Sequence, residues 1–282
     1  MVDFPESGVF FVGNATMLIR YDGFTLLTDP NFLHRGRRAY LGYGLSSRRR
    51  TDPAIQVEDL PPLDAVVLSH MHGDHWDRVA RRGLDRSVPI VTTRQAARRL
   101  RRQGFGEAAG LSTWQERILR RDGRTLKITA LPGRHAPGAA QVLLPPVMGS
   151  MLEFGRRDGR VGLRMYISGD TLMDRELLAP IPERYPDIDV GVVHLGGTMI
   201  LGMMMVTMDG AQGAEWLSFI GPRHAVPIHY DDYEAFSSGL DDFREEVERR
   251  GLSDRVRYLA RGETCPLPVR TARRKAPAPQ RS

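Results

Sequence analysis

One six-residue segment constrains this chain more than any other: His70-Met71-His72-Gly73-Asp74-His75. It follows the run Ala-Val-Val-Leu-Ser at 65–69, whose apolar, β-prone residues predict a buried strand that ends where the histidines begin. Imidazole nitrogens and carboxylate oxygens are ligands that suit zinc and similar divalent ions. His70 and His72 point the same way in an extended backbone and can share one ion. Asp74 and His75 lie past the predicted strand and can turn toward a second ion.

The composition favours one large α/β domain with a hydrophobic core, which we place at residues 1–269. The chain has 282 residues, 41% of them hydrophobic, and no apolar run reaches the roughly 18 residues that span a bilayer. The first residues show no basic stretch followed by an apolar one, so we expect no secretory signal and a cytoplasmic protein. Cys265 is the only cysteine, which excludes an intrachain disulfide and argues against thiolate metal ligands.

The formal net charge of +6 comes mostly from the end of the sequence. Residues 270–282 carry five basic side chains and no acidic one, and we predict a disordered basic tail there. Subtracting these five charges leaves +1 for the rest of the chain. A nearly neutral domain does not favour nucleic acid as a partner, so we expect a small-molecule or lipid-like substrate instead. The oligomeric state stays open.

Hydrophobic periodicity predicts alternating strands and helices along the chain. The expected strands lie at residues 9–12, 16–21, 24–28, 65–69, 89–92, 125–131, 161–167, 190–193 and 225–228. The expected helices lie at residues 77–82, 95–103, 209–220 and 240–250. Asp22-Gly23 indicates a tight hairpin between two of the strands. Residues 33–53 show no regular pattern, and we expect an irregular loop that is functional or mobile.

Three further side chains of the metal-ligating kind follow predicted strands. His135 comes after strand 125–131, Asp170 after strand 161–167, and His229 after strand 225–228. Open α/β architectures place their sites at the edge where strands end. Each residue alone has a structural interpretation, such as an aspartate that caps a turn. Together with the first segment, they indicate a binuclear metal centre.

These segments resemble the metallo-β-lactamase-fold superfamily, in particular the branch that holds N-acyl-phosphatidylethanolamine phospholipase D and L-ascorbate-6-phosphate lactonase. The resemblance runs from about Phe10 to Phe243. Its motifs are Gly13-Asn14-Ala15-Thr16, Leu27-Thr28-Asp29-Pro30, residues 70–77, Ser168-Gly169-Asp170-Thr171 and Pro227-Ile228-His229-Tyr230. It implies an α/β fold, the four-layer αββα sandwich of the metallo-β-lactamase type, with the site at one edge between the sheets.

The resemblance also implies roles for individual residues. The first ion would be bound by His70, His72 and His135. The second ion would be bound by Asp74, His75 and His229, and Asp170 would bridge both ions. Asp29 would orient a ligand histidine, although it is also a simple turn former before proline. The chain departs from the branch at Asn14, where a histidine is common.

The expected function is binuclear metal-dependent hydrolysis, in which a metal-bridging hydroxide attacks a phosphodiester, ester or lactone of a small or lipid-like molecule. Ligation by three histidines favours two Zn²⁺ ions, with Mn²⁺ or Fe²⁺ as alternatives. Asp74 is the candidate catalytic residue, because it is placed to accept the proton of the attacking water. The alternatives are a lactonase or amide-type hydrolase of a non-phosphorylated metabolite, a nuclease, and a non-catalytic binding protein on the same fold.

Several residues outside the predicted ligand set are candidates for substrate contact. The segment from Met199 to Met208 holds five methionines, which suit an apolar pocket wall or ordinary core packing. Residues 143–151 are the candidate opposing wall. Tyr40 and Tyr43, with the arginines around them, are a candidate lid that meets an anionic group. His194 either orients substrate or is a buried structural histidine.

Overall fold

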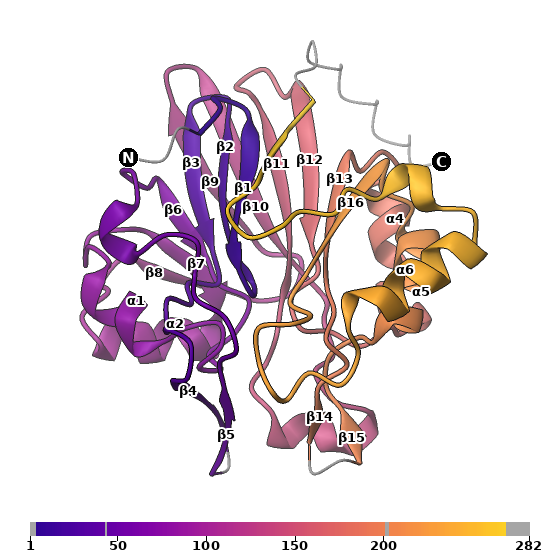
Figure 1. Ribbon diagram of the computed structural model, residues 1–282. Coiled ribbons are helices and arrows are strands. Elements are labelled where there is room, and N and C mark those ends of the chain that lie inside the picture. Colours follow the sequence, from indigo (N-terminus) through magenta and orange to yellow (C-terminus); the bar gives the residue numbers. More distant parts are fainter. Residues whose placement is uncertain (1–3, 43, 201–202, 269–282) are drawn as a thin grey trace.

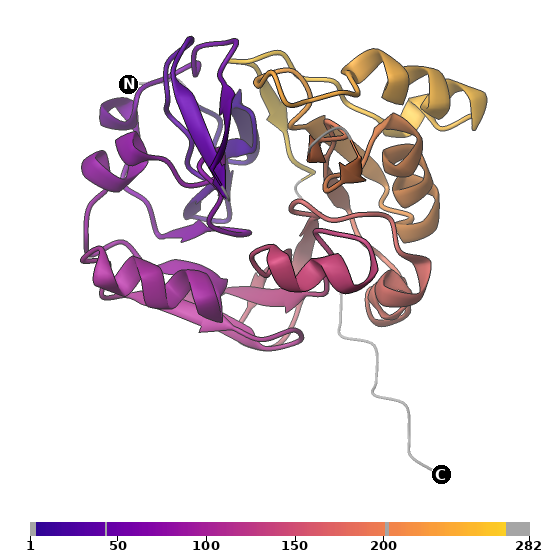
Figure 2. The ribbon, with the colours of Figure 1, turned by 90° about the horizontal axis from the view of Figure 1, so that it is seen from below.

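The computed structural model describes residues 4–42, 44–200 and 203–268. Its core is a pair of mixed β-sheets that face each other (Figure 1). The first sheet has the strand order β17-β1-β2-β3-β6-β7-β8, and the second has the order β16-β13-β12-β11-β10-β9. Helices cover the outer side of each sheet, so the molecule is the predicted four-layer αββα sandwich of the metallo-β-lactamase type (Figure 2). The tail predicted at 270–282 lies outside the described residues.

The strands of the first sheet are β1 (Gly8–Gly13), β2 (Thr16–Tyr21), β3 (Phe24–Thr28), β6 (Ala65–Val67), β7 (Ile90–Thr93), β8 (Ala108–Leu111) and β17 (Thr264–Pro266). Those of the second are β9 (Glu116–Arg121), β10 (Arg124–Leu131), β11 (Gly149–Arg156), β12 (Val161–Ile167), β13 (Val190–His194) and β16 (His224–Ile228). The helices are α1 (Arg78–Gly83), α2 (Arg94–Arg102), α3 (Arg175–Leu178), α4 (Pro180–Arg184), α5 (Gly210–Ile220) and α6 (Leu240–Arg249). Three short 3₁₀ turns are η1 (Val57–Asp59), η2 (Gly138–Leu143) and η3 (Ser253–Arg255).

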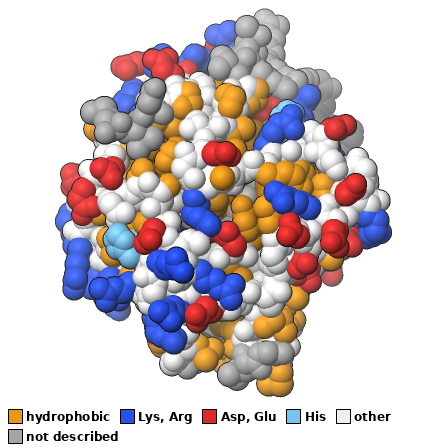
Figure 3. Space-filling view, viewed as in Figure 1, with side chains coloured by type: hydrophobic (Ala, Val, Ile, Leu, Met, Phe, Trp, Pro, Cys, Tyr) orange, Lys and Arg blue, Asp and Glu red, His pale blue; other side chains and the backbone are white. Residues whose placement is uncertain are grey.

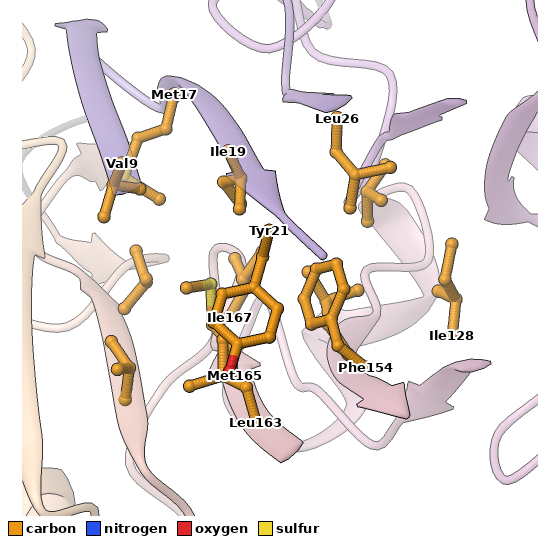
Figure 4. Close-up of a cluster of buried hydrophobic side chains, with 14 of the residues drawn as sticks. Val9, Met17, Ile19, Tyr21, Leu26, Ile128, Phe154, Leu163, Met165 and Ile167 are labelled. Atoms are coloured by element: carbon orange, nitrogen blue, oxygen red, sulfur yellow. The ribbon is translucent and has the colours of Figure 1, made fainter. Parts of the chain in front are cut away.

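Alternating side chains of buried strands supply two different cores. In β2, Ile19 points into the core between the sheets, whereas its neighbour Leu18 packs toward α1 and α2. Figure 4 shows the core between the sheets, where Tyr21 of the first sheet meets Phe154 of the second at a ring separation of 5.1 Å. Both faces of these strands are covered, which explains why their sequences read as continuous apolar runs.

The outer helices pack through small or apolar residues. Trp216 of α5 lies against Gly191 of β13, where a Cβ atom would stand 2.8 Å from the indole ring. The close approach of helix and sheet therefore requires glycine at this position. Asp209 caps α5 by accepting a hydrogen bond from the backbone of Gln212 at 2.8 Å, which agrees with the predicted helix start. No helix among the described residues is long and apolar enough to cross a bilayer.

Two segments differ from the sequence-based expectation. Residues 33–53, predicted to be irregular, contain an antiparallel hairpin of β4 (Arg38–Gly42) and β5 (Leu45–Arg48). The hairpin pairs only with itself and is largely exposed, so it lacks the alternating apolar pattern by which strands are recognised. Residues 143–151 end inside β11, a strand that was not predicted and that pairs with β10 and β12 in the second sheet; that the segment forms a pocket wall stays a prediction. The Asp22-Gly23 hairpin is confirmed, with both residues at positive φ.

Candidate metal centre

The predicted ligands meet at one edge of the sandwich, between the two sheets. The segment 70–75 follows β6, and His135, Asp170 and His229 follow β10, β12 and β16. The hairpins β4–β5 and β14–β15, the latter formed by β14 (Met199–Ile200) and β15 (Met204–Met205), project from the same edge (Figure 1). Polar residues that follow strands of both sheets therefore lie close together at this edge, as the sequence predicted.

The first cluster consists of three imidazoles. Nε2 of His70 lies 3.0 Å from Nδ1 of His72, and Nε2 of His135 lies 3.1 Å from the same atom. Three nitrogens at about 2.0–2.1 Å from a tetrahedral ion lie about 3.3 Å apart, so the spacing fits one shared ion. The opposite nitrogen of His135 lies 2.7 Å from the carbonyl oxygen of Val206 and donates to it, which turns Nε2 toward the cluster.

The second cluster adjoins the first and contains Asp74, His75, Asp170 and His229, all of them buried. Nε2 of His75 lies 3.2 Å from Oδ2 of Asp170, and Nε2 of His229 lies 3.4 Å from Oδ2 of Asp74. Nδ1 of His229 donates to the carbonyl oxygen of Leu195 at 3.0 Å, so its Nε2 is the nitrogen left to bind an ion.

The buried ligand atoms fit a bound cation. Within the part of the chain that the structure describes, one nitrogen or oxygen of every second-cluster residue is buried without a hydrogen-bond partner. These atoms are Asp74 Oδ1, His75 Nε2, Asp170 Oδ1 and His229 Nε2. Leaving so many polar atoms unsatisfied in one interior would be costly, and divalent ions among them would satisfy their lone pairs.

The two clusters differ in how their histidines hold protons. Burial lowers the pKa of all three first-cluster imidazoles, that of His72 to about 3, and the nearby carboxylate of Asp170 opposes this shift in each of them. Burial also disfavours the charged forms of His75 and His229, but there the carboxylates of Asp170 and Asp74 outweigh it and raise both pKa values. The first cluster is therefore neutral at pH 7, whereas the second stabilises positive charge.

Asp29 lies beside the second cluster. Its Oδ1 accepts hydrogen bonds from the backbone and hydroxyl of Ser69, and its Oδ2 lies 3.5 Å from Nδ1 of His75 and 3.6 Å from Nε2 of His194. Burial raises the pKa of Asp29, but the charges and hydrogen bonds of His75 and His194 together outweigh it and bring the value to about 2. An ionised Asp29 can thus orient His75. Asp29, His75 and His194 also form a third group with ligand spacing.

Asn14 supports the second cluster and had no role in the sequence analysis. Its side-chain Nδ2 donates to the carbonyl oxygen of Asp74 at 2.7 Å, and its own carbonyl accepts from the backbone of His229 at 3.1 Å. Its backbone N donates to Asp232, which pairs with the buried Arg49. Asn14 has a φ of 53°, a left-handed conformation that asparagine tolerates. The motif at residues 13–16 marked this position but did not indicate its contacts.

The residues predicted to contact substrate lie in different environments. Tyr40 is exposed on β4, and its carbonyl accepts from the backbone of Gly73 at 2.8 Å. Met199 is half-buried on β14, in a hairpin whose Met204 packs with Val206 and η2. His194 is fully buried, with Nδ1 3.2 Å from the hydroxyl of Ser168. Tyr43 lies outside the described residues.

Comparison with known proteins agrees with this geometry. A family model described as a β-lactamase superfamily domain matches residues 25–230. The chain belongs to this superfamily. It is 30% identical over 259 residues to a UPF0173 metal-dependent hydrolase of Deinococcus radiodurans, covering 91% of this chain and 97% of the relative. It is 32% identical over 142 residues to an N-acyl-phosphatidylethanolamine-hydrolyzing phospholipase D of Caenorhabditis elegans, covering 46% of this chain and 39% of that one.

Solved structures share the fold of this superfamily member. A possible metal-dependent hydrolase from Veillonella parvula aligns over 93% of this chain and all of its own, with a TM-score of 0.77 and 22% identity. An isothiocyanate hydrolase from Delia radicum gut bacteria aligns over 92% of this chain and 99% of its own, with a TM-score of 0.75 and 24% identity. The chain is thus a metal-dependent hydrolase with the metallo-β-lactamase fold.

Proposed function

We propose that the chain is a binuclear hydrolase in which the two clusters each hold one divalent ion. His70, His72 and His135 would bind the first ion, and Asp74, His75 and His229 the second. Asp170 would bridge them, because it belongs to the second cluster and its charge also acts on every imidazole of the first. The observation that carries the proposal is the pair of adjoining clusters whose buried ligand atoms have no hydrogen-bond partner.

The residues of the site would orient the ligands and accept the proton of the attacking water. Bound divalent ions would supply a bridging hydroxide nucleophile near neutral pH and polarise the oxygen of the scissile bond. Asp74 presents Oδ2 to His229, and its Oδ1 is available to accept the proton of the attacking water. His75 and His229 hold the pKa of Asp74 below its usual range against the effect of burial, so the carboxylate is ionised and able to accept.

The ligand chemistry favours zinc at the first site. Three imidazole nitrogens are a common zinc environment, whereas the second cluster has more oxygen ligands and would accept Mn²⁺ or Fe²⁺ as well. We therefore propose two Zn²⁺ ions, with Mn²⁺ or Fe²⁺ as the alternatives.

The substrate we propose is a phosphodiester, ester or lactone of a small or lipid-like molecule. An apolar cluster supports this: Ala136, Leu144 and Val206 pack with Ile200 and Met204 next to His135. Such a wall suits the apolar part of a substrate. The partial similarity to a phospholipase D of Caenorhabditis elegans supports the lipid-like phosphodiester within this class.

Activity of the metal-reconstituted protein against a panel of phosphodiesters, lactones and thioesters tests the proposal. We expect turnover of a phosphodiester such as bis(4-nitrophenyl) phosphate that depends on added metal. The His70→Ala/His72→Ala/Asp74→Ala variant should lose at least about a hundredfold in rate. His34→Ala, which alters an exposed histidine away from both clusters, should leave the rate unchanged. Full activity in the triple variant would contradict the proposal, and turnover of lactones alone would favour a lactonase.

A further inference from the structure

Large exposed hydrophobic side chains gather at the end of the molecule that carries the metal centre. Among the described residues they are Tyr40 (61% exposed), Val142 (85%), Leu143 (56%) and Met203 (81%). We call these four residues the apolar rim. Figure 3 shows hydrophobic side chains at this lower end of the molecule, with Lys and Arg side chains beside them. Large apolar side chains that point into solvent from one end of a protein typically mark an interaction surface.

Two residues of the apolar rim lie on hairpins that contact the metal-ligating segments. Met203 lies in the β14–β15 hairpin, which packs on η2 and precedes Val206, the residue that orients His135. Tyr40 lies on β4, whose backbone binds Gly73 inside the metal-ligating segment. A surface that contacts the rim therefore lies against the two hairpins that contact the metal-ligating segments.

The β4–β5 hairpin adds an unbalanced positive charge beside the apolar rim. Its arginines and those next to it are exposed: Arg35, Arg37, Arg38, Arg48 and Arg50. Residues 31–51 contain no Asp or Glu, and none of these five guanidinium groups forms an ion pair with another described residue. The adjoining Asp52 contacts this segment through His34 and the backbone of Arg35, which leaves the guanidinium groups in excess. Elsewhere many arginines are paired, as Arg156 is with Asp22. The hairpin thus offers several positive charges to an external anionic partner.

A hollow beside the hairpin has the same chemistry. It measures about 300 Å³ and is lined by the arginines Arg38, Arg78 and Arg81 together with the apolar Met71 and Trp76. Asp77 also lines it, but its carboxylate is buried and accepts hydrogen bonds from three backbone amides. Guanidinium groups are well suited to phosphate oxygens, and the neighbouring apolar surface suits the stem of an amphiphile.

We propose that this end of the molecule docks on an anionic lipid surface, with the apolar rim inserted and the hairpin arginines facing the headgroups. Apolar side chains next to unpaired basic ones are the combination that binds such surfaces. A second copy of the chain is a poorer occupant, because a two-fold contact through this face would bring the arginines of one hairpin toward those of the other. The proposal does not depend on the substrate or the reaction of the metal centre.

Sedimentation with vesicles tests the electrostatic half of the proposal. The metal-reconstituted full chain should bind phosphatidylcholine vesicles that contain phosphatidylglycerol, and should bind pure phosphatidylcholine and high-salt samples much more weakly. Each arginine contributes about a factor of five, so Arg35→Ala/Arg37→Ala/Arg48→Ala should weaken binding roughly a hundredfold. The matched control Arg98→Ala/Arg99→Ala/Arg102→Ala removes three exposed arginines from α2 and should change binding less than about threefold.

Substitutions of the apolar rim residues test whether the rim inserts into the lipid. Val142→Ser/Met203→Ser should weaken binding at least about tenfold, because two side chains lose their transfer into the lipid. Val142→Leu/Met203→Leu preserves the apolar surface and should bind as the wild type does. Both residues are more than four-fifths exposed, so we expect unchanged melting temperature and metal content in every variant.

Three outcomes would overturn the proposal. The first is no binding of the wild type to anionic vesicles. The second is an equal loss in the two arginine variants, which would reduce the effect to general charge attraction. The third is unchanged vesicle binding in the serine variant with a loss of dimer on gel filtration, which would make a second copy the occupant of the rim. Because sedimentation requires no turnover, failure of this proposal is distinguishable from failure of the proposed hydrolysis.

Discussion

Asn14 joins the backbones of two candidate ligands of the second ion. Its side chain binds the carbonyl of Asp74, and its carbonyl binds the amide of His229. His229 itself has a φ of 65°, so its backbone is held in a left-handed conformation that few residues adopt without support. The geometry of the second cluster therefore depends on a residue that touches neither proposed ion.

We predict that Asn14→Gly weakens binding of the second ion about tenfold and leaves the first unchanged. Glycine accepts the φ of 53° without strain, so the substitution removes only the side-chain hydrogen bond to Asp74. Calorimetric titration of metal-free protein resolves the two affinities. Asp122→Gly, at a turn with a φ of 46° far from the site, is the control and should bind both ions normally. Equal weakening of both ions by Asn14→Gly would assign it a general structural role instead.

The opposite pKa shifts of the two clusters predict different proton release. At pH 7 the first-cluster histidines are neutral, because their pKa values are lowered, so the first ion displaces few protons. The carboxylates of Asp170 and Asp74 raise the pKa values of His75 and His229, so these imidazoles keep their protons to higher pH and the second ion must displace more protons than the first. Affinity for the second ion should therefore rise with pH, and affinity for the first should not.

Calorimetry in buffers of different ionisation enthalpy measures this proton release for each ion. Equal release for the two ions, or none for the second, would show that the carboxylates do not keep His75 and His229 charged.

At the scale of elements, sequence periodicity found most of the buried strands and missed several others, among them two short hairpins and the buried strand β11. The strands before His70, His135, Asp170 and His229 all read as apolar runs, and they are present. The hairpins β4–β5 and β14–β15 were missed because they are short and pair only with themselves. The strand β11 was missed because Gly149 and Gly155 at its ends obscure the pattern, although it pairs along its length with β10.

Asp77 links the metal-ligating segment to two other elements. Its Oδ1 caps α1 by accepting from Ala80 at 2.7 Å, and its Oδ2 accepts from the backbones of Phe32 and Leu33 at 2.5 and 2.6 Å. The side chain is buried, and burial raises its pKa although these donors oppose the shift. One carboxyl group thus fixes both the start of the helix and the loop that leads to β4.

We predict that Asp77→Ala lowers the free energy of unfolding by about 3–5 kcal/mol, because it removes a cap and leaves two buried backbone donors unsatisfied. Asp77→Asn keeps one acceptor oxygen for residues 32–33 but turns its NH2 group toward the backbone N–H of Ala80, so it should cost about 1–2 kcal/mol. Urea unfolding of the metal-loaded protein measures both. Asp209→Ala removes the cap of α5 alone and should cost about 1 kcal/mol. If Asp77→Ala cost no more than Asp209→Ala, the link to residues 32–33 would be energetically irrelevant.

At the scale of the whole molecule, the site is assembled by the meeting of two sheets. The segment 70–75 belongs to the first sheet, and His135, Asp170 and His229 belong to the second. The sequence predicted this set because every member follows a recognisable strand. It assigned no role to Asn14, Arg49 or Asp232, because the contacts of Asp232 with the other two join residues more than 180 positions apart and leave no local pattern.

Removal of the ions should destabilise the entire fold. The metal-free protein retains several buried ligand atoms without partners, and both sheets contribute them. Each ion that binds only the native state would stabilise it by about 4 kcal/mol at a thousandfold excess over its dissociation constant. Thermal melting with and without a chelator measures this effect, and restoration by Zn²⁺ is the control. A melting temperature that chelation leaves unchanged would contradict a resident metal centre that links the sheets.

The central claim is that two ions bind in two adjoining clusters and that hydrolysis requires both. The most direct measurement is a titration of metal-free protein with Zn²⁺ in which bound metal and hydrolytic rate are followed together. We expect saturation at about two ions per chain, with most of the activity appearing as the second ion binds. Saturation at one ion with full activity, or activity in the absence of any bound metal, would contradict the account.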